Sequence, residues 1–328
     1  MTAGTQELKR KLAVMAKQKS PLNKTIDFSE EDGKEYLAPC LADFELRESY
    51  SLQEICDKTI FGDTFSVLPK LPEKFADLII ADPPYNLEKN YNSTKFKEKT
   101  SSAYADYTKA WLEPALRLLK DEGSLYICCD WKTSILIASV LADYEKAGLL
   151  RIQNRITWER EKGRGAKTNW KNCHEDIWFV TKTGDYTFNL DAVKMRRRVI
   201  APYKVDGKPK DWTECSEGNY RDTCPSNFWS DISIPFWSMP ENTAHPTQKA
   251  EKLLAKLILA SSNVGDIVFD PFLGSGSTSV TAKKLGRHWC GIEREARYCE
   301  FAEYRLQLAE SDKTIQGFED GIFKERNS

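Results

Sequence analysis

The sequence predicts an α/β protein with a doubly wound, mostly parallel sheet, and three observations point to that fold class. Short apolar runs rich in isoleucine, leucine and valine recur along the chain, which is typical of strands buried on both faces. Segments with apolar residues at helical spacing separate these runs, as the crossovers of a parallel sheet require. Two of the runs end in clusters of polar residues, proline and glycine, and open α/β sheets bind ligands at the carboxyl ends of their strands.

Each expected strand is a short run of apolar and β-branched residues. The run 77–81 stops at two prolines, which cannot continue a central strand because they lack N–H donors. The run 266–270 likewise stops at a proline, while 152–158 and 176–181 alternate in the manner of strands. The expected strands are 59–61, 77–81, 124–129, 152–158, 176–181, 266–270 and 288–292.

Between these strands, apolar residues recur every three or four positions, which predicts helices. In the segment 107–120 they include Trp111, Leu112 and Leu116, and Gly123 is expected to end this helix. Two polar, lysine-rich or arginine-rich segments, 86–102 and 159–175, are expected to be loops. The expected helices are 66–71 (a short helix or turn), 107–120, 133–147, 250–260 and 278–285.

The composition indicates a soluble globular protein. With 328 residues, 41% of them hydrophobic and 30% charged, the chain can form one large α/β domain with a smaller module. No apolar run approaches the roughly 18 residues of a membrane span, and the N-terminus lacks the apolar core of a signal peptide. Nine cysteines without a Cys-x-x-Cys pair, and only three histidines, favour reduced thiols in a cytoplasm and no metal site.

Charge is distributed unevenly, although the net charge is only −1. Residues 151–182 carry eight lysines and arginines against four acids. A local basic face is what contacts phosphates, although a solvated charged surface would produce the same counts. The candidate DNA-binding residues are Lys162, Arg164 and Lys167 in the basic loop, and Arg196, Arg197 and Arg198 further along the chain.

The cluster after the strand 77–81 is Asp82-Pro83-Pro84-Tyr85, whose residue types suit the exocyclic amine of a nucleobase. Such an amine is a poor nucleophile because its lone pair is delocalised into the ring. The Asp82 carboxylate and the Pro83 carbonyl can each accept one of its two N–H bonds, which directs the lone pair towards an electrophile. Pro83 and Pro84 stiffen the loop, and Tyr85 offers a face on which a base can stack. The alternative is a strand-ending Asp-Pro turn, which is common.

The second cluster runs from Asp270 to Thr278, and in it Gly274 and Gly276 remove Cβ atoms where a ligand must pass close to the backbone. The next expected strand ends in Glu293, at the position from which an acid bonds ribose hydroxyls in dinucleotide sites. The third glycine of the dinucleotide fingerprint is absent, which disfavours a nicotinamide dehydrogenase. A single nucleoside that carries a sulfonium fits this pattern better.

Together these motifs resemble the S-adenosylmethionine-dependent amino DNA methyltransferases of the permuted β class, in particular the adenine-N6 enzymes of the RsrI and MboII type. In that class the Asp-Pro-Pro-Tyr motif comes first, followed by the target-recognition region and then the cofactor motif. The resemblance covers roughly residues 58–305, and Ala250 departs from it because the family usually has proline after Gln-Lys. The shared stretches are Gly62-Asp63, Asp82 to Asn86, His174-Glu175-Asp176, Leu190 to Val193, Asn227-Phe228-Trp229, His245 to Lys249, and Asp270 to Thr278.

The resemblance also implies an architecture. It is a Rossmann-like methyltransferase sheet with an antiparallel edge strand and a small target-recognition insertion. The expected divisions are an N-terminal extension (1–50), the catalytic half of the methyltransferase domain (51–181), the target-recognition region (182–244), the cofactor-binding half (245–308) and a C-terminal tail (309–328).

Residue roles follow from the same resemblance. The catalytic residues Asp82, Pro83, Pro84 and Tyr85 would hold a target base that has been flipped out of the duplex. The ammonium of Lys249 would bind the carboxylate or the ribose of the cofactor. The residues expected around S-adenosylmethionine are Asp63, Asp82, His245, Thr247, Lys249, Asp270, Phe272, Gly274, Ser275, Gly276, Thr278 and Glu293.

The activity that the resemblance implies is N6-adenine methylation of a specific double-stranded DNA sequence in a restriction–modification context, without a metal. N4-cytosine methylation uses the same geometry, although that group more often has serine in place of Asp82. A non-catalytic DNA-binding module is an alternative of another class. The expected partners are double-stranded DNA and a cognate restriction endonuclease without a stable complex. The chain is expected to be a monomer or homodimer that acts in the cytoplasm of a prokaryotic cell, at the nucleoid.

Overall fold

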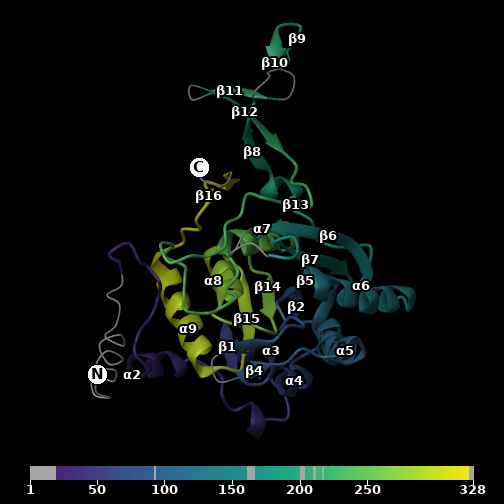
Figure 1. The fold of residues 1–328 in the computed structure, drawn as a ribbon, viewed down its shortest axis with the longest axis vertical. Coiled ribbons are helices and arrows are strands. Elements are labelled where there is room, and N and C mark those ends of the chain that lie inside the picture. The colour runs from purple at the N-terminus through teal and green to yellow at the C-terminus, as the bar shows by residue number, and fades with distance from the viewer. Residues whose placement is uncertain are drawn as a thin grey trace.

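A computed structural model describes residues 20–91, 94–160, 167–199, 204–209, 212–215 and 218–324. At its centre lies an eight-stranded sheet (Figure 1). The order across this sheet is β1 (Lys58–Phe61), β15 (His288–Glu293), β14 (Ile267–Asp270), β2 (Ala76–Ala81), β5 (Leu119–Asp130), β7 (His174–Thr181), β6 (Arg151–Glu159) and β13 (Phe228–Trp229).

The sheet is mostly parallel, which confirms the prediction. Strands β1, β15, β14, β2 and β5 run in one direction, and β7 is antiparallel to both of its neighbours. The strands β6 and β13 beyond it return to the common direction. The antiparallel strand was expected at the edge, but it lies inside the sheet because β6 pairs along its outer side.

Helices cover both faces of the sheet, as the doubly wound class requires. The helices that pack on it are α5 (Ser101–Leu118), α6 (Trp131–Lys146), α7 (Glu251–Ser261), α8 (Ser277–Lys284) and α9 (Ala296–Ser311). Successive side chains of a strand point to opposite faces. Accordingly, Ile79 of β2 is buried in the layer of α5 and α6, whereas Leu78 and Ile80 are buried against α7 and α8.

Each strand and helix predicted above has a counterpart in the structure, but the boundary between α5 and β5 differs from the prediction. Helix α5 ends at Leu118 and β5 begins at the next residue, so Gly123 lies within the strand and does not end the helix. A Cβ atom at Gly123 would lie 2.6 Å from Cδ1 of Leu119 and 3.0 Å from the carbonyl oxygen of Asp77. Glycine is therefore needed for the close approach of β5 and β2.

The expected loop 86–102 contains a two-stranded hairpin and the start of α5. The hairpin strands are β3 (Lys89–Tyr91) and β4 (Thr94–Phe96). After β4, the side chain of Asn86 fixes the chain, because it donates to the Lys99 carbonyl and accepts from the Lys99 amide. This segment is thereby held beside the end of β2.

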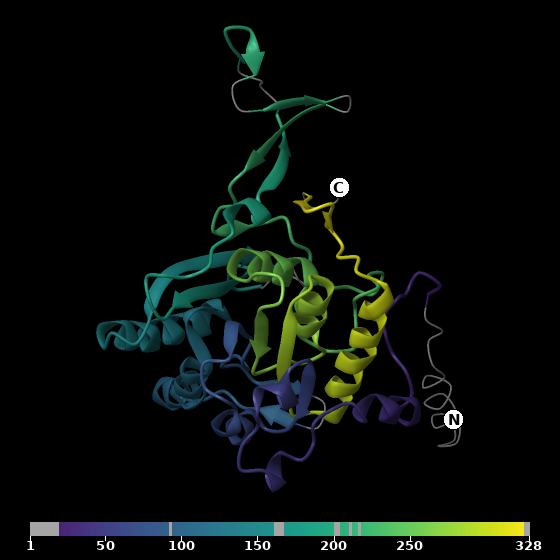
Figure 2. The same cartoon turned by 180° about the vertical axis from the view of Figure 1, so that it is seen from behind.

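A second, smaller sheet projects from the main domain (Figures 1 and 2). Its strands, in spatial order, are β11 (Thr213–Cys215), β12 (Gly218–Thr223), β8 (Met195–Arg198), β17 (Ile322–Phe323) and β16 (Phe318–Glu319). The hairpin of β9 (Lys204–Val205) and β10 (Lys208–Pro209) lies at its far end. Because Phe323 pairs with Met195, residues from the C-terminal tail help to form this projecting sheet.

The first described residues run along the segment that precedes His245. Ile26 forms a parallel bridge with Thr243, and Phe28 lies 5.3 Å from the ring of Phe301 in α9. The guanidinium of Arg297 lies over the Phe28 ring, 4.4 Å from its centre. Within the described ranges, no helix combines the length and the apolar character needed to cross a bilayer.

Candidate active site

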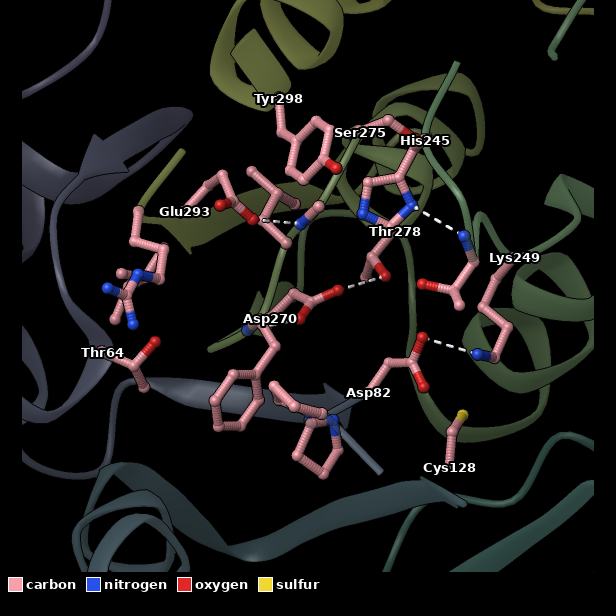
Figure 3. A pocket seen from close by; sticks show the side chains of 18 of the residues that line it. Thr64, Asp82, Cys128, His245, Lys249, Asp270, Ser275, Thr278, Glu293 and Tyr298 are labelled. Carbon is pink, nitrogen blue, oxygen red and sulfur yellow. Dashed lines mark hydrogen bonds and ion pairs between the residues drawn. The ribbon is translucent and has the colours of Figure 1, made fainter. Parts of the chain in front are cut away.

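One pocket lies at the carboxyl ends of β2, β14 and β15, and it brings the two sequence motifs together (Figure 3). Both motifs follow neighbouring strands, since β14 pairs directly with β2. The parallel register therefore places both strand ends at one edge of the sheet. The predicted residues that line the pocket are Asp63, Asp82, Pro83, Pro84, Tyr85, His245, Thr247, Lys249, Asp270, Phe272, Gly274, Ser275, Thr278 and Glu293.

The two glycines of the turn after β14, Gly274 and Gly276, have different structural roles. Gly274 lines the pocket with a φ of +57°, and a Cβ there would lie 3.1 Å from Nε2 of His245. Gly276 has a φ of +80° and does not line the pocket. A Cβ on Gly276 would lie 2.6 Å from the Cβ of Ala302, so this glycine allows α8 to pack closely on α9.

Glu293 ends β15 as a buried acid whose oxygens are held by the backbone. Its Oε2 accepts from the Gly274 amide at 2.8 Å, and its Oε1 accepts from the Glu295 amide at 2.7 Å. Burial raises the pKa of Glu293 to about 7. A carboxylate fixed in this way at the pocket wall can accept hydrogen bonds from the hydroxyls of a sugar.

Asp270, at the end of β14, is a second buried acid in the pocket. Its carboxylate accepts from the Thr278 hydroxyl at 2.6 Å and from the Phe272 amide at 2.9 Å. Burial raises the pKa of Asp270 to about 7. These bonds fix the shape of the glycine turn, because they tie the end of the strand to the first turn of α8.

Asp82 lies at the end of β2 and contacts two other pocket residues. Its Oδ2 accepts from Nζ of Lys249 at 2.5 Å, and its Oδ1 accepts from the Tyr85 hydroxyl at 2.9 Å. Burial and the carboxylates of Asp82 and Glu175 raise the pKa of Tyr85, so its hydroxyl remains a donor. Burial alone would lower the pKa of Lys249, but the same two carboxylates raise it above its usual range.

Glu175 is a site residue to which the sequence analysis gave no role. Its Oε2 accepts from the Tyr85 hydroxyl at 3.1 Å and lies 3.5 Å from Nζ of Lys249, while its other oxygen accepts from Arg160. Glu175 is the second residue of β7, and because β7 is antiparallel to β5 and β6, its beginning lies where these neighbouring strands end. The shared stretch His174-Glu175-Asp176 was the only signal for it in the sequence.

His245 lines the pocket beside the glycine turn. Its ring lies 4.4 Å from that of Tyr298, edge to face, and its Nδ1 accepts from the Thr247 amide at 3.3 Å. Burial and the nearby ammonium of Lys249 lower the pKa of His245 to about 3. The imidazole is therefore neutral at physiological pH and serves as a wall of the pocket.

Asp63 lies at the outer rim of the pocket. It caps the short helix α4 (Thr64–Val67) by accepting from the Phe65 amide at 3.1 Å. Among the described residues, the only group whose ligand atoms could surround a metal ion is Cys56, Asp57 and His288. That group lies at the amino ends of β1 and β15, at the opposite edge of the sheet from the pocket.

The candidate DNA-binding residues that the structure describes do not line the pocket. Arg196, Arg197 and Arg198 form β8 in the projecting sheet, where they are exposed. The Arg196 guanidinium is paired with Asp222 at 3.0 and 3.2 Å, whereas Lys167 is exposed in the segment that precedes β7. Lys162 and Arg164 lie outside the described residues.

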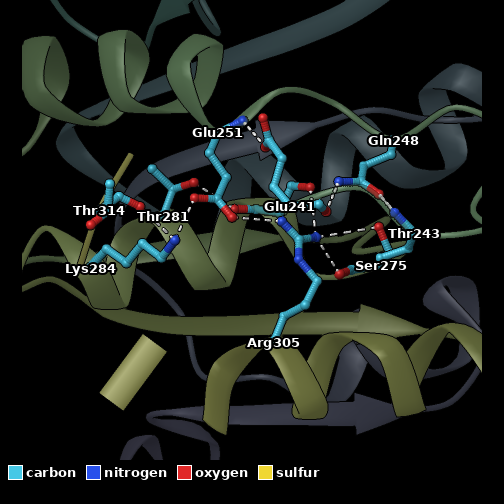
Figure 4. A network of polar contacts seen from close by, with 10 residues as sticks. Glu241, Thr243, Gln248, Glu251, Ser275, Thr281, Lys284, Arg305 and Thr314 are labelled. Atoms are coloured by element: carbon cyan, nitrogen blue, oxygen red, sulfur yellow. Dashed lines mark hydrogen bonds and ion pairs between the residues drawn. The ribbon is translucent and has the colours of Figure 1, made fainter. Parts of the chain in front are cut away.

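A buried polar network stands behind the pocket wall (Figure 4). Arg305 of α9 donates to the Ser275 carbonyl at 2.7 Å and to Oε1 of Glu251 at 2.8 Å. Lys284 donates to the other oxygen of Glu251 at 2.8 Å. Since Ser275 belongs to the glycine turn and Glu251 opens the helix that follows Lys249, Arg305 joins the two segments that form the pocket wall.

Comparison with known proteins identifies relatives of this chain. Residues 76–304 match the DNA methylase family. The chain is 35% identical over 263 residues to the Type II methyltransferase M.HpaI of Haemophilus parainfluenzae, covering 80% of this chain and 76% of M.HpaI. It is 34% identical over 257 residues to the DNA adenine methyltransferase YhdJ of Escherichia coli K12, covering 76% of this chain and 82% of YhdJ.

Solved structures share the fold. The cytosine-N4-specific PvuII DNA methyltransferase has a TM-score of 0.56 at 18% identity, covering 77% of this chain and 90% of that one. The complex of M1.HpyAVI with SAM has a TM-score of 0.51 at 23% identity, covering 76% and 98%. TTHA0409 of Thermus thermophilus, complexed with S-adenosyl-L-methionine, has a TM-score of 0.51 at 21% identity, covering 82% and 98%.

A strand-end pocket that combines a glycine turn with a buried acid is typical of α/β proteins that bind a nucleoside cofactor. The chain belongs to the DNA methylase family. It is therefore an amino DNA methyltransferase of the N6/N4 type that depends on S-adenosylmethionine. The predicted class and its cofactor are confirmed.

Proposed function

We propose that this protein methylates the N6 amine of adenine in a specific sequence of duplex DNA. The observation that carries the proposal is the direct pairing of β2 and β14, which places Asp82 and Gly274 in the lining of one pocket. One methyl group can pass between a cofactor at the glycine turn and an amine at Asp82. A base must leave the duplex to reach this pocket, which costs a few kcal/mol.

In the proposed complex, the Asp82 carboxylate and the Pro83 carbonyl each accept one N–H bond of the target amine. Pro84 keeps the loop rigid, and the Tyr85 ring stacks on the base. The acceptors aim the nitrogen lone pair and stabilise the positive charge that develops on nitrogen during transfer. Holding the amine and the methyl donor in line lowers the activation free energy of the transfer, because the two groups are already placed to react.

The cofactor supplies an electrophilic methyl group when bound, and the residues present fit it. We propose that Glu293 accepts from the ribose hydroxyls, because its carboxylate is already fixed at the wall by two backbone amides. Asp63 lies at the rim, on the adenine side of the proposed site. The residues assigned to the methionine part of the cofactor are Phe272, Gly274, Ser275, His245 and Thr247.

Adenine is favoured over cytosine by two observations. The first is that the catalytic motif begins with an aspartate, Asp82, whereas the N4-cytosine group more often has serine at this position. The second is that YhdJ, at 34% identity, is a DNA adenine methyltransferase. The test is to methylate PCR-amplified bacterial genomic DNA, which carries no methyl groups, and to digest it to nucleosides. N6-methyldeoxyadenosine is the expected product, whereas N4-methyldeoxycytidine would replace the adenine assignment, and no transferred methyl group would indicate a DNA-binding module.

We further propose that the region 182–244 reads the DNA sequence. Its projecting sheet carries Arg197 and Arg198 exposed on β8, where they can contact phosphates or guanine edges. A restriction–modification context agrees with M.HpaI being a Type II methyltransferase. Sequencing the methylated DNA at single-base resolution would identify the recognition site.

Cofactor affinity is expected to rise with pH between 6 and 8. The pKa values of Asp270 and Glu293 are raised to about 7 by burial, and a bound cofactor with a positive sulfonium favours their ionised forms. Each group that must be ionised contributes about a tenfold gain over this range. Titration calorimetry should show this gain and proton release, both reduced in Glu293→Gln. An affinity independent of pH would contradict the prediction.

Asp270 and Glu293 also make the stability of the ligand-free protein depend on pH, but this stability falls as the pH rises. Their pKa values are higher in the folded chain than their usual values of 3.8 and 4.5, so the folded state binds more protons between pH 4 and 7. Their contribution to the free energy of unfolding is therefore full at low pH and is lost as the pH rises towards 7.

A further inference from the structure

Four charged side chains meet beside Tyr85, and they alternate in sign. Arg160 donates to Glu175, and Glu175 lies 3.5 Å from Lys249, which in turn lies 2.5 Å from Asp82. The side chains of Lys249 and Glu175 are only 7% and 5% exposed. Charges this deeply buried are costly unless each has a partner, so the cluster is stable only as a set.

In this arrangement both carboxylate oxygens of Asp82 already accept a hydrogen bond. Its Oδ2 already accepts from Lys249, and its Oδ1 accepts from Tyr85. Moreover, the target nitrogen becomes positively charged while the methyl group is transferred, and an ammonium 2.5 Å from Asp82 would oppose that charge. Methyl transfer would therefore be easier with the ammonium of Lys249 away from Asp82.

We propose that Glu175 is a positioning residue that receives the ammonium of Lys249 when the target amine enters, and so releases Asp82. Lys249 keeps its proton and changes partner by rotating its side chain. Arg160 holds one oxygen of Glu175, which leaves Oε2 facing Lys249 and Tyr85. The Tyr85 hydroxyl, 2.9 Å from Asp82 and 3.1 Å from Glu175, is within reach of both carboxylates and can turn its single proton from one to the other during the exchange.

This inference rests on the proposed function, in which Asp82 accepts from the target amine. Its test is Glu175→Gln, which keeps the shape of the side chain but removes the charge that attracts Lys249. With tritiated S-adenosylmethionine and PCR-amplified genomic DNA, both saturating, the single-turnover rate should fall about tenfold or more. The cofactor Kd and the KM for DNA should remain unchanged, because Glu175 does not contact either ligand in the proposed complex.

A second substitution separates positioning from a general structural role. Adding Lys249→Met to Glu175→Gln removes the ammonium that would otherwise remain on Asp82, so the double variant should be faster than Glu175→Gln alone. The matched control is Glu122→Gln, the same change at an exposed acid of β5, which should keep the wild-type rate. If Glu175→Gln does not fold, Glu175→Asp, which keeps the charge but withdraws it from Lys249, should show the same loss of rate.

Two results would overturn the inference. One is a wild-type rate in Glu175→Gln, and the other is a double variant no faster than that single variant. Asp82→Ala distinguishes this failure from failure of the proposed function. If Asp82→Ala is inactive while Glu175→Gln is normal, only the role of Glu175 is wrong; if Asp82→Ala is active, the proposed function itself is wrong.

Discussion

Asp82→Ala is expected to abolish methyl transfer, with a loss of at least about 10³-fold in kcat, while cofactor binding stays largely intact. The substitution removes the acceptor that orients the target amine and stabilises its developing positive charge. It does not remove a contact of the glycine turn or of Glu293, which lies across the pocket from Lys249 in Figure 3. The ammonium of Lys249 retains Glu175 as a partner at 3.5 Å, so the pocket should keep its shape.

The measurement pairs tritium transfer to DNA with calorimetric titration of S-adenosylmethionine. Asp82→Asn is informative because its amide oxygen can still accept one hydrogen bond, so it should retain more activity than the alanine variant. Asp121→Ala, which removes an exposed carboxylate from β5, is the matched control and should methylate normally. Near-normal turnover by Asp82→Ala would refute the assignment of the catalytic residue.

Much of this site was predictable because it depends on strand ends. The run before Asp82 and the run before Asp270 are each apolar, short and followed by proline, which fixes where the strands stop. In a parallel sheet, strand ends gather at one edge whatever their order, so two motifs separated by more than half of the chain can be expected to meet there. The observed β2–β14 pair satisfies that expectation.

Glu175 could not be placed by the same reasoning. It begins a strand, and a residue at the beginning of a parallel strand would lie at the wrong edge of the sheet. Only the reversed direction of β7, which pairs Asp130 with Glu175, brings this acid to the pocket. Strand direction depends on long-range pairing, and the local pattern of 176–181 is the same for either direction.

The pairing of the C-terminal tail and the network around Arg305 could not be predicted from the sequence for another reason. Residues 318–323 form the two-residue strands β16 and β17, which pair with each other, and β17 in turn pairs with β8. Arg305 lies on α9 among alternating polar and apolar residues, where a solvated face would produce the same pattern. Burial of a charged group depends on partners that are distant in sequence, and these partners are Ser275 and Glu251.

Arg305→Met is expected to lower the free energy of unfolding by about 3–5 kcal/mol, because it leaves a buried acid short of its partner. The side chains of Arg305 and Glu251 are 2% and 4% exposed. Glu241, whose pKa burial and the adjacent Glu251 raise to about 7, lies in the same network. Without Arg305, Lys284 is the remaining cation on Glu251, and the total stability of a domain is only about 5–15 kcal/mol.

Urea unfolding with Lys324→Met as control tests this prediction, because Lys324 belongs to the exposed pair with Glu319 and should change stability little. Adding Glu251→Met to Arg305→Met should recover part of the loss, since the buried acid that has lost one of its cationic partners is then also removed. Arg305 also holds the Ser275 carbonyl of the glycine turn, so the single variant should bind S-adenosylmethionine more weakly even where it is fully folded. An unchanged unfolding midpoint would mean that this buried ion pair is not what joins the two walls of the pocket, and that backbone packing at Gly276 and Ala302 is sufficient.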